Sequence, residues 1–427
     1  MDDFNQNQEQ YIKERMKQRP LNRKKLMRRT IVTALMAVIF GVLACFTFLV
    51  LEPVFTNLLY PEDEPTVVVI PEDEEEIKPE DMLLDDEDSP EVTAPVQEKE
   101  DVSPLELYKN AMGDAKVLAN DVMKSMVKVI GESQDKDWFD DSYTNENVTT
   151  GLFIANNGRE LLFLTETGKL NNSEDINVIF ADGKKAVATI KQMDVNTDLC
   201  IIAVETGSVS KDSLDKLKPA VVANSINAAS IMTPVIVVGY IYGNGETYVL
   251  GNITSNTEQI SLTDSNYRII NTDIYGSSQA TGVMVNLKGE VVGIVNRSLM
   301  NNEAPYMISA FGISDLKDTI ERMSNGKSNP LLGVTGIDVS DEAHEEKGVP
   351  YGAYVTGIVM NSPAMKAGIQ SGDIIVKMDD TEIIKYAQLT DLLMSREPES
   401  EVVLTIMRQA HDEYRDIEIN IVLGENK

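Results

Sequence analysis

The sequence predicts a mainly β protein with an N-terminal transmembrane helix and an α+β unit at its C-terminal end. Between about residues 126 and 320, short β-rich runs alternate with Gly, Asn and Asp, which is typical of β-sandwiches and of paired β-barrels. From Asn329-Pro330 onward, strand patterns mix with one helical pattern at about 385–396. Near the N-terminus, residues 31–51 form an uncharged run of 21 residues.

This uncharged run is long enough to cross a bilayer, because a helix needs roughly 20 apolar residues to do so. Residues 1–29 carry nine Lys and Arg, and the chain after the run is acidic. Since basic flanks stay in the cytoplasm, the pattern predicts a cytoplasmic basic tail over 1–30 and a transmembrane helix over 31–51. We therefore expect a single-pass protein of the cell membrane whose bulk is extracytoplasmic. A cleaved signal peptide, or a lipid attached at Cys45, is the alternative.

A strongly acidic segment follows the predicted span. Residues 61–101 carry eighteen Asp and Glu against Lys78 and Lys99. Such a segment cannot bury enough apolar surface to fold, and its like charges repel one another. The sequence therefore predicts an acidic disordered linker over 52–101, and it leaves open whether this linker also binds something.

Order is expected to resume at Ser103. The motif Ser103-Pro-Leu-Glu106 is a capping box with proline at the first helical position. Apolar residues then recur at helical spacing, from Leu105 through Tyr108 and Met112 to Val122. These features predict a helix over about 104–125.

Composition excludes several classes of function. With 427 residues and 42% apolar side chains, the chain is large enough for two globular domains and is not wholly disordered. Two cysteines, Cys45 and Cys200, are too few for a disulfide framework or a cysteine zinc site. The only histidines are His344 and His411, and a net charge of −31 argues against nucleic acid as a partner. We expect no cofactor and no metal.

Two groups of motifs resemble parts of one known family. Leu331-Leu-Gly-Val334, Gly352-Ala-Tyr-Val355 and Ser362-Pro-Ala-x-x-Ala-Gly-Ile-x-x-Gly-Asp373 resemble the PDZ domain of HtrA/Deg-type serine proteases. Upstream, Asn196-Thr-Asp-Leu199 and Val285-Asn-Leu-Lys-Gly-Glu-Val-Val-Gly-Ile294 resemble the trypsin-like domain of that family. The resemblance covers roughly residues 120–427 and implies two six-stranded barrels with an active site between them.

The resemblance also locates the catalytic triad, which needs a serine, a histidine that takes its proton and an aspartate that orients the imidazole. The histidine motif aligns with Leu164-Thr-Glu-Thr-Gly168, so glycine stands at the position of the base, while the aspartate is kept as Asp198. The serine motif aligns with Ser278-Gln-Ala-Thr-Gly-Val-Met-Val-Asn286, which puts Ala280 at the position of the nucleophile. The resemblance thus implies a protease frame without its base and nucleophile. The alternative is a displaced pair, in which Lys169 activates Ser277 or Ser278.

A PDZ groove remains as a candidate binding site. PDZ domains add an extended peptide to a sheet edge, while backbone amides of a loop hold its terminal carboxylate. By resemblance that loop is Leu331-Leu332-Gly333-Val334, and Val334–Ile337 is the pairing edge. The other wall would be a helix carrying Leu389, Leu392 and Leu393, which can share one face. Some of these leucines are alternatively part of the core.

Together these observations predict five parts: a tail over 1–30, a membrane helix over 31–51, a linker over 52–101, a trypsin-like (pseudo)protease domain over 102–325 and a PDZ domain over 329–427. The function implied by the resemblance is that of a membrane-anchored pseudoprotease that binds unfolded or C-terminal segments of extracytoplasmic proteins, in quality control or as an adaptor. An active serine endopeptidase that uses displaced residues and a structural oligomeric scaffold, such as a homotrimer, are the alternatives.

Overall fold

The computed structural model describes residues 27, 34–40, 43, 65–73, 103–136, 142–171, 173–243, 245–299, 306–411 and 413–426. Backbone contacts divide the chain into two units, Met1–Glu64 and Pro65–Lys427. In the first unit, residues 34–40 are helical. Among the described residues, no helix is both long and apolar enough to cross a membrane. Most of the predicted span over 31–51, and of the tail before it, lies outside the described residues.

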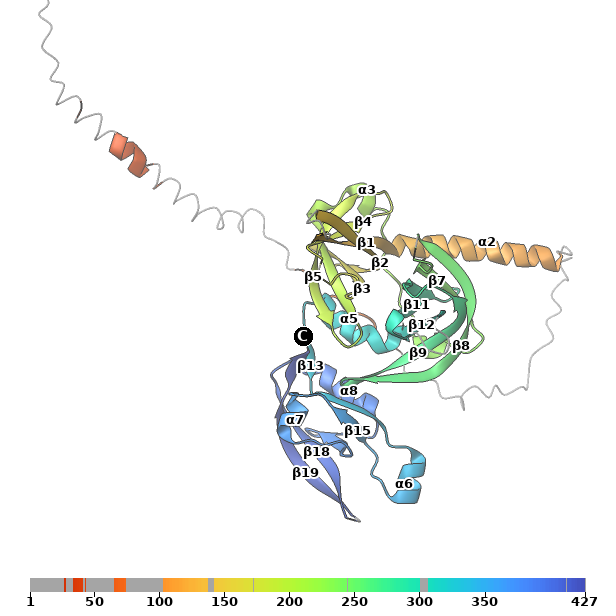
Figure 1. Cartoon of the computed structure of the whole chain (residues 1–427), viewed down its shortest axis with the longest axis vertical. Coiled ribbons are helices and arrows are strands. Elements are labelled where there is room, and N and C mark those ends of the chain that lie inside the picture. Colours follow the sequence, from red (N-terminus) through yellow and green to blue (C-terminus); the bar gives the residue numbers. More distant parts are fainter. Residues whose placement is uncertain are drawn as a thin grey trace, which may run out of the picture. The chain divides into compact units, whose positions relative to one another are not determined.

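A long helix opens the folded part of the second unit. Helix α2 (Pro104–Val122) begins as the capping box predicts, because the Ser103 side chain accepts a hydrogen bond from the Glu106 amide. Only its C-terminal end is buried, through Ala119 and Val122, and a short 3-10 helix (Met123–Ser125) then leads into the first strand. Figure 1 shows α2 extending away from the barrels.

Two closed six-stranded barrels follow, which confirms the expected pair. The first barrel is β1 (Met126–Lys136), β2 (Ser142–Asn156), β3 (Glu160–Glu166), β4 (Asp175–Ile179), β5 (Lys185–Asp194) and β6 (Leu199–Glu205), joined in the order β1-β2-β3-β6-β5-β4. The second is β7 (Pro234–Tyr240), β8 (Thr247–Leu262), β9 (Ser265–Tyr275), β10 (Thr281–Val285), β11 (Val291–Val295) and β12 (Met307–Gly312), joined in the order β10-β11-β12-β9-β8-β7. Short helices α3 (Lys211–Leu214) and α4 (Ser225–Ala228) lie between the barrels in sequence, and α5 (Lys317–Ser324) follows the second.

The central strands are buried on both faces, which explains their continuous apolar runs. In β3, Phe163 packs inside the first barrel, whereas its neighbours Leu162 and Leu164 join a core shared by both barrels. In β10, Val283 and Val285 join the same shared core, and Met284 between them packs inside the second barrel. Because successive side chains of a strand point to opposite faces, one face fills a barrel and the other joins the two barrels.

The C-terminal unit is an α+β fold. Its main sheet has the order β14 (Val334–Asp338), β15 (Ala353–Ile358), β16 (Ile374–Met378), β18 (Glu401–Ala410) and β19 (Glu413–Val422), with β17 (Thr381–Glu382) paired to β16. A second, two-stranded sheet joins β13 (Asn329–Leu331) to β20 (Gly424–Asn426). The helices are α6 (Asp341–Lys347), α7 (Pro363–Ala367) and α8 (Tyr386–Met394), and α8 matches the predicted helix. Strand β14 lies at the end of this sheet order.

Part of the predicted disordered linker is bound to the folded body. Residues 65–73 lie in extended backbone, and Val68 among them is buried. The side chain of Asn325 clamps Val68, accepting from its amide at 3.0 Å and donating to its carbonyl at 2.9 Å. The Ile70 amide donates to Glu321 of α5, and Lys317 forms an ion pair with Asp73. This nine-residue segment, hereafter the strap, is therefore held in place rather than free.

Candidate functional site

The three positions that the resemblance equates with a catalytic triad lie on loops that meet. Gly168 follows the end of β3, and Ala280 directly precedes β10. The side chain of Lys169 donates a hydrogen bond to that of Gln279, which ties these two loops together. The Asp198 carbonyl accepts from the Thr167 amide at 2.9 Å, so the third loop joins them. The structure thus brings together the backbone of the predicted site.

Two of these positions lack the groups that nucleophilic catalysis needs. Glycine at 168 has no side chain that could take a proton, and Ala280, which is fully buried, presents a methyl group where a hydroxyl would attack. The cavity lined by Glu166, Thr281 and neighbouring residues of both barrels measures about 10 Å³. Such a volume holds about one water molecule. Gly168, Asp198 and Ala280 themselves do not line this cavity.

The backbone amides at and beside Ala280 form hydrogen bonds within their own turn. An oxyanion hole needs amide groups that point at the position where negative charge develops. Here the Ala280 amide donates to the Ser277 carbonyl at 3.0 Å, and the Gln279 amide donates to the Ser277 hydroxyl at 3.0 Å. The turn therefore uses these donors within itself.

The members of the displaced serine–lysine pair lie on the two loops that meet at this site. Lys169 is half-buried, and its amine donates to the side-chain oxygen of the exposed Gln279. A lysine that acts as a base must be desolvated. The Ser277 hydroxyl accepts from the Gln279 amide, and Ser278 is exposed. Asp198 is half-buried, with a positive φ of 58°.

The loop of the candidate PDZ groove gathers three backbone amides around one carboxylate. The amides of Leu332, Gly333 and Val334 donate to the side chain of Asp264 at 2.8 to 2.9 Å. Gly333 is required in this loop, because its φ is +90° and an added Cβ would lie 2.1 Å from the Ser362 Cβ. Sequence reasoning missed Asp264, since a Thr-Asp-Ser stretch between two strands resembles any polar turn.

The remaining predicted groove residues are divided between core and surface. Leu332, Val334, Leu389 and Leu393 are buried in the core of the C-terminal unit, and Leu331 and Leu392 are half-buried. The Tyr386 hydroxyl at the start of α8 donates to the Val334 carbonyl at 3.1 Å. The helix and the loop therefore lie against one another, as the two ends of a groove would.

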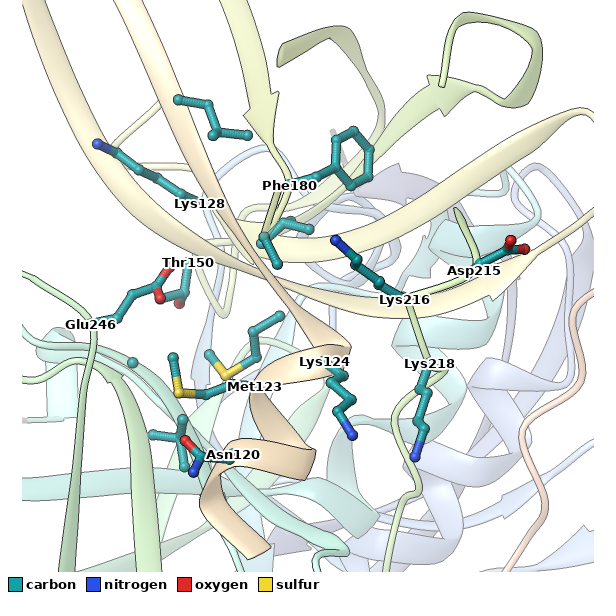
Figure 2. Close-up of a pocket in the computed structure, with 16 residues that line it drawn as sticks. Asn120, Met123, Lys124, Lys128, Thr150, Phe180, Asp215, Lys216, Lys218 and Glu246 are labelled. Atoms are coloured by element: carbon teal, nitrogen blue, oxygen red, sulfur yellow. The ribbon is translucent and has the colours of Figure 1, made fainter. Parts of the chain in front are cut away.

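A larger cavity of about 560 Å³ lies beside the end of α2. Figure 2 shows its lining, where Met123 and Phe180 supply apolar surface and Lys124, Lys128, Lys216 and Lys218 supply positive charge. Lys124 and Lys218 both pair with Asp121. This cavity is distinct from the loops around Gly168 and Ala280.

The remaining candidates for a site are clusters of metal-ligating residue types, the His344 ring and the Cys200 thiol. Within the described parts of the chain, no cluster of His, Cys, Asp and Glu could hold a metal ion. The His344 ring stacks on Tyr351, and its Nδ1 lies 2.8 Å from the Val349 carbonyl oxygen. Burial raises the pKa of the Cys200 thiol to about 12, which keeps it protonated and unreactive.

Comparisons with known proteins agree with this architecture. Family models of a trypsin-like peptidase domain and a PDZ domain match residues 149–294 and 330–421. A probable periplasmic serine endoprotease, DegP-like, of Rickettsia prowazekii is 32% identical over 62% of this chain, which spans only 51% of that relative. The serine endoprotease DegS of Haemophilus influenzae is 26% identical over 61% of this chain and 74% of its own length.

Among solved structures, an HtrA-type protease, AlgW, with a decapeptide is similar in fold, with a TM-score of 0.53. The match covers 73% of this chain and 99% of that chain, at 17% identity.

Proposed function

Because this chain belongs to the HtrA-type family, which joins a trypsin-like peptidase domain to a PDZ domain, we propose that it is a pseudoprotease that binds polypeptides without cleaving them. The observation that carries this proposal is the chemistry at two loop positions. Gly168 supplies no base and Ala280 no nucleophile, and the Ala280 amide is hydrogen-bonded to Ser277. Since triad members work only as a unit, the loss of two of them removes the family's acyl-transfer route.

The proposed binding site is the groove formed by the loop 331–334, the edge strand β14 and helix α8. A sheet edge has backbone groups that can pair with an extended peptide, and converging amides can hold a carboxylate. The solved AlgW structures with a decapeptide and with a tripeptide support a peptide-binding role, carried over to this chain by analogy. Apolar side chains of Leu389, Leu392 and Leu393 would favour apolar chain ends.

We place this activity outside the cytoplasm. Several relatives are named as periplasmic proteases, and the uncharged run over 31–51 with its basic flank favours a single membrane anchor. The partners would be unfolded or C-terminal segments of extracytoplasmic proteins, in quality control or as an adaptor.

The absence of catalysis is tested with a fluorophosphonate probe, which labels activated serines. The full chain is expected to remain unlabelled under conditions that label the Haemophilus influenzae DegS relative. If the probe labels this chain and the labelling disappears in Ser277→Ala or Ser278→Ala, that serine is a displaced nucleophile. This result would refute the proposal that the chain is a pseudoprotease.

The binding site is tested with a pair of glycine variants. Gly333→Ala places a methyl group against Ser362 and must shift the loop, whereas Gly368→Ala meets nothing within 4 Å although its φ of +84° is similar. We expect capture of an unfolded test protein, reduced and alkylated casein, to fall about tenfold in Gly333→Ala, a loss of about 1.4 kcal/mol, and to stay unchanged in Gly368→Ala. If Gly333→Ala and Gly368→Ala capture casein equally well, the groove is not the binding site. That result would favour an oligomeric scaffold.

A further inference from the structure

The tip of the β8–β9 hairpin touches the C-terminal unit at the candidate groove. Asp264 stands at this tip, between the end of β8 and the start of β9, with a φ of 61°. In Figure 1 the hairpin reaches from the second barrel toward α8. Its contacts with the C-terminal unit are specific hydrogen bonds, and they fall on each of the three parts of the groove.

The first contact is with the loop. Both carboxylate oxygens of Asp264 accept hydrogen bonds, one from the Leu332 and Gly333 amides and the other from the Gly333 and Val334 amides. The side chain is buried, and an unpaired buried carboxylate would be strongly unfavourable. Three successive amides that face one concavity form an anion site, so this loop is arranged to hold a carboxylate.

The second contact is with the edge strand. The Asp264 amide donates to the Val334 carbonyl at 2.7 Å. Farther along β14, the Gly336 carbonyl accepts from the Ser261 hydroxyl at 3.1 Å and from the Asn266 side chain at 3.2 Å. These carbonyls belong to the strand at which an added peptide would pair.

The third contact is with the helix. The hydroxyl of Thr390, on α8, donates to the Asp264 carbonyl at 3.0 Å. One residue of the barrel domain is thus bound through its side chain, its amide and its carbonyl. The loop, the strand and the helix each supply a hydrogen-bond partner to Asp264. The last residue of a bound peptide would use partners at the same place.

We propose that Asp264 is an intramolecular ligand of this groove, whose side chain occupies the place of a partner's terminal carboxylate. A free chain end then binds only when the hairpin tip leaves. This inference rests on the proposed function, because it takes the same groove as the peptide site. It also restricts the partner class, since a segment that ends in a free α-carboxylate can replace all of the bonds to the loop and an internal segment cannot.

The inference predicts competition within the molecule. A tethered ligand acts at an effective concentration that reaches the millimolar range, so it competes with an external ligand for the same loop amides. Removing the Asp264 side chain should therefore tighten peptide binding by about tenfold or more. Ordinary groove residues behave in the opposite way, because their removal weakens binding.

The test uses the full chain and three variants. Asp264→Gly deletes the carboxylate and tolerates a positive φ, and Asp264→Asn removes its charge while keeping the turn, because asparagine also adopts this conformation. Glu258→Gln is the control, since Glu258 is an exposed carboxylate on β8 of the same hairpin. The probes are fluorescein-labelled decapeptides ending in Val, Leu or Phe, each with a free C-terminal carboxylate and as a C-terminal amide.

We expect the free-carboxylate peptides to bind Asp264→Gly at least tenfold more tightly than wild type, and the amidated peptides to show no such gain. Glu258→Gln should match wild type. In parallel, hydrogen exchange at the Leu332, Gly333 and Val334 amides should accelerate in Asp264→Gly while exchange in the barrel strands stays unchanged, which verifies that the variant is folded.

Each of the other outcomes would overturn one defined part of the proposal. Equal peptide affinities in wild type and both Asp264 variants would overturn the internal ligand and leave the proposed function intact. No binding to any variant, with the loop amides freed in Asp264→Gly, would overturn the proposed peptide binding and with it the displacement. Equal gains for free and amidated peptides would overturn the role of the carboxylate.

Discussion

Ala280 differs from serine by one oxygen atom, and the backbone amides of its turn are also engaged in hydrogen bonds within the turn. Its amide is bonded to the Ser277 carbonyl, and Ser278 and Thr281 stand where the resemblance implies glycine. The sequence alone identifies the missing hydroxyl and imidazole, because these are residue identities. It does not reveal the direction of the amide, which depends on how the turn folds. Restoring the two side chains would therefore leave the Ala280 amide hydrogen-bonded to the Ser277 carbonyl.

Asp264 makes stability depend on pH. Burial raises its pKa from the ordinary value of 3.8 to about 6, although the three loop amides partly offset this. Because the folded state then holds the proton more tightly than the unfolded chain, this group's contribution is fully present below about pH 4 and is lost as pH rises through about 6.

We therefore expect wild type to lose stability relative to Asp264→Asn between pH 4 and pH 7, by at most about 3 kcal/mol. Urea unfolding of both proteins across this range measures the difference, and the shared buried carboxyl groups Asp194 and Asp315 cancel in it. A difference that stays constant with pH would show that the Asp264 carboxyl does not change its protonation there.

At the scale of elements, local sequence patterns predicted helix starts and strands, which depend on residues close together in sequence. The capping box at Ser103 fixed the start of α2, because a cap depends on residues within one turn. Continuous apolar runs in β3 and β6 indicated strands, since both faces of these strands are buried. The strap was missed because the acidic residues around it dominate its composition. The available signal was the apolar run Thr66-Val-Val-Val-Ile70 inside that acidic stretch.

The Asn325 side chain makes two of the hydrogen bonds that hold the strap. Asn325→Ala removes both hydrogen bonds to Val68, so we expect the strap to detach and to be cut by a nonspecific protease several times faster than in wild type. The loss of two part-buried hydrogen bonds should cost about 2 kcal/mol in the free energy of unfolding. Asn420→Ala, at an exposed position on β19, is the matched control and should change neither quantity. Unchanged cleavage of the strap in Asn325→Ala would show that other contacts suffice.

At the scale of the whole molecule, the contacts that matter most join residues far apart in sequence. Asp264 lies 68 to 70 positions before the amides that it binds and 126 before Thr390. Periodicity and turn chemistry report on neighbours within about 18 residues, so they carry no information on such a pair. The resemblance gave the order of the domains but not the way in which they touch. This is why the loop 331–334 was predicted as an open site, and its occupant was not predicted.

The strap changes how far the folded body could stand from a bilayer. If residues 31–51 anchor the chain as proposed, the connection between the anchor and the folded domains consists only of the residues between 51 and 65. It does not include the whole acidic stretch. Fully drawn out, it reaches about 45 Å at ~3.3 Å per residue.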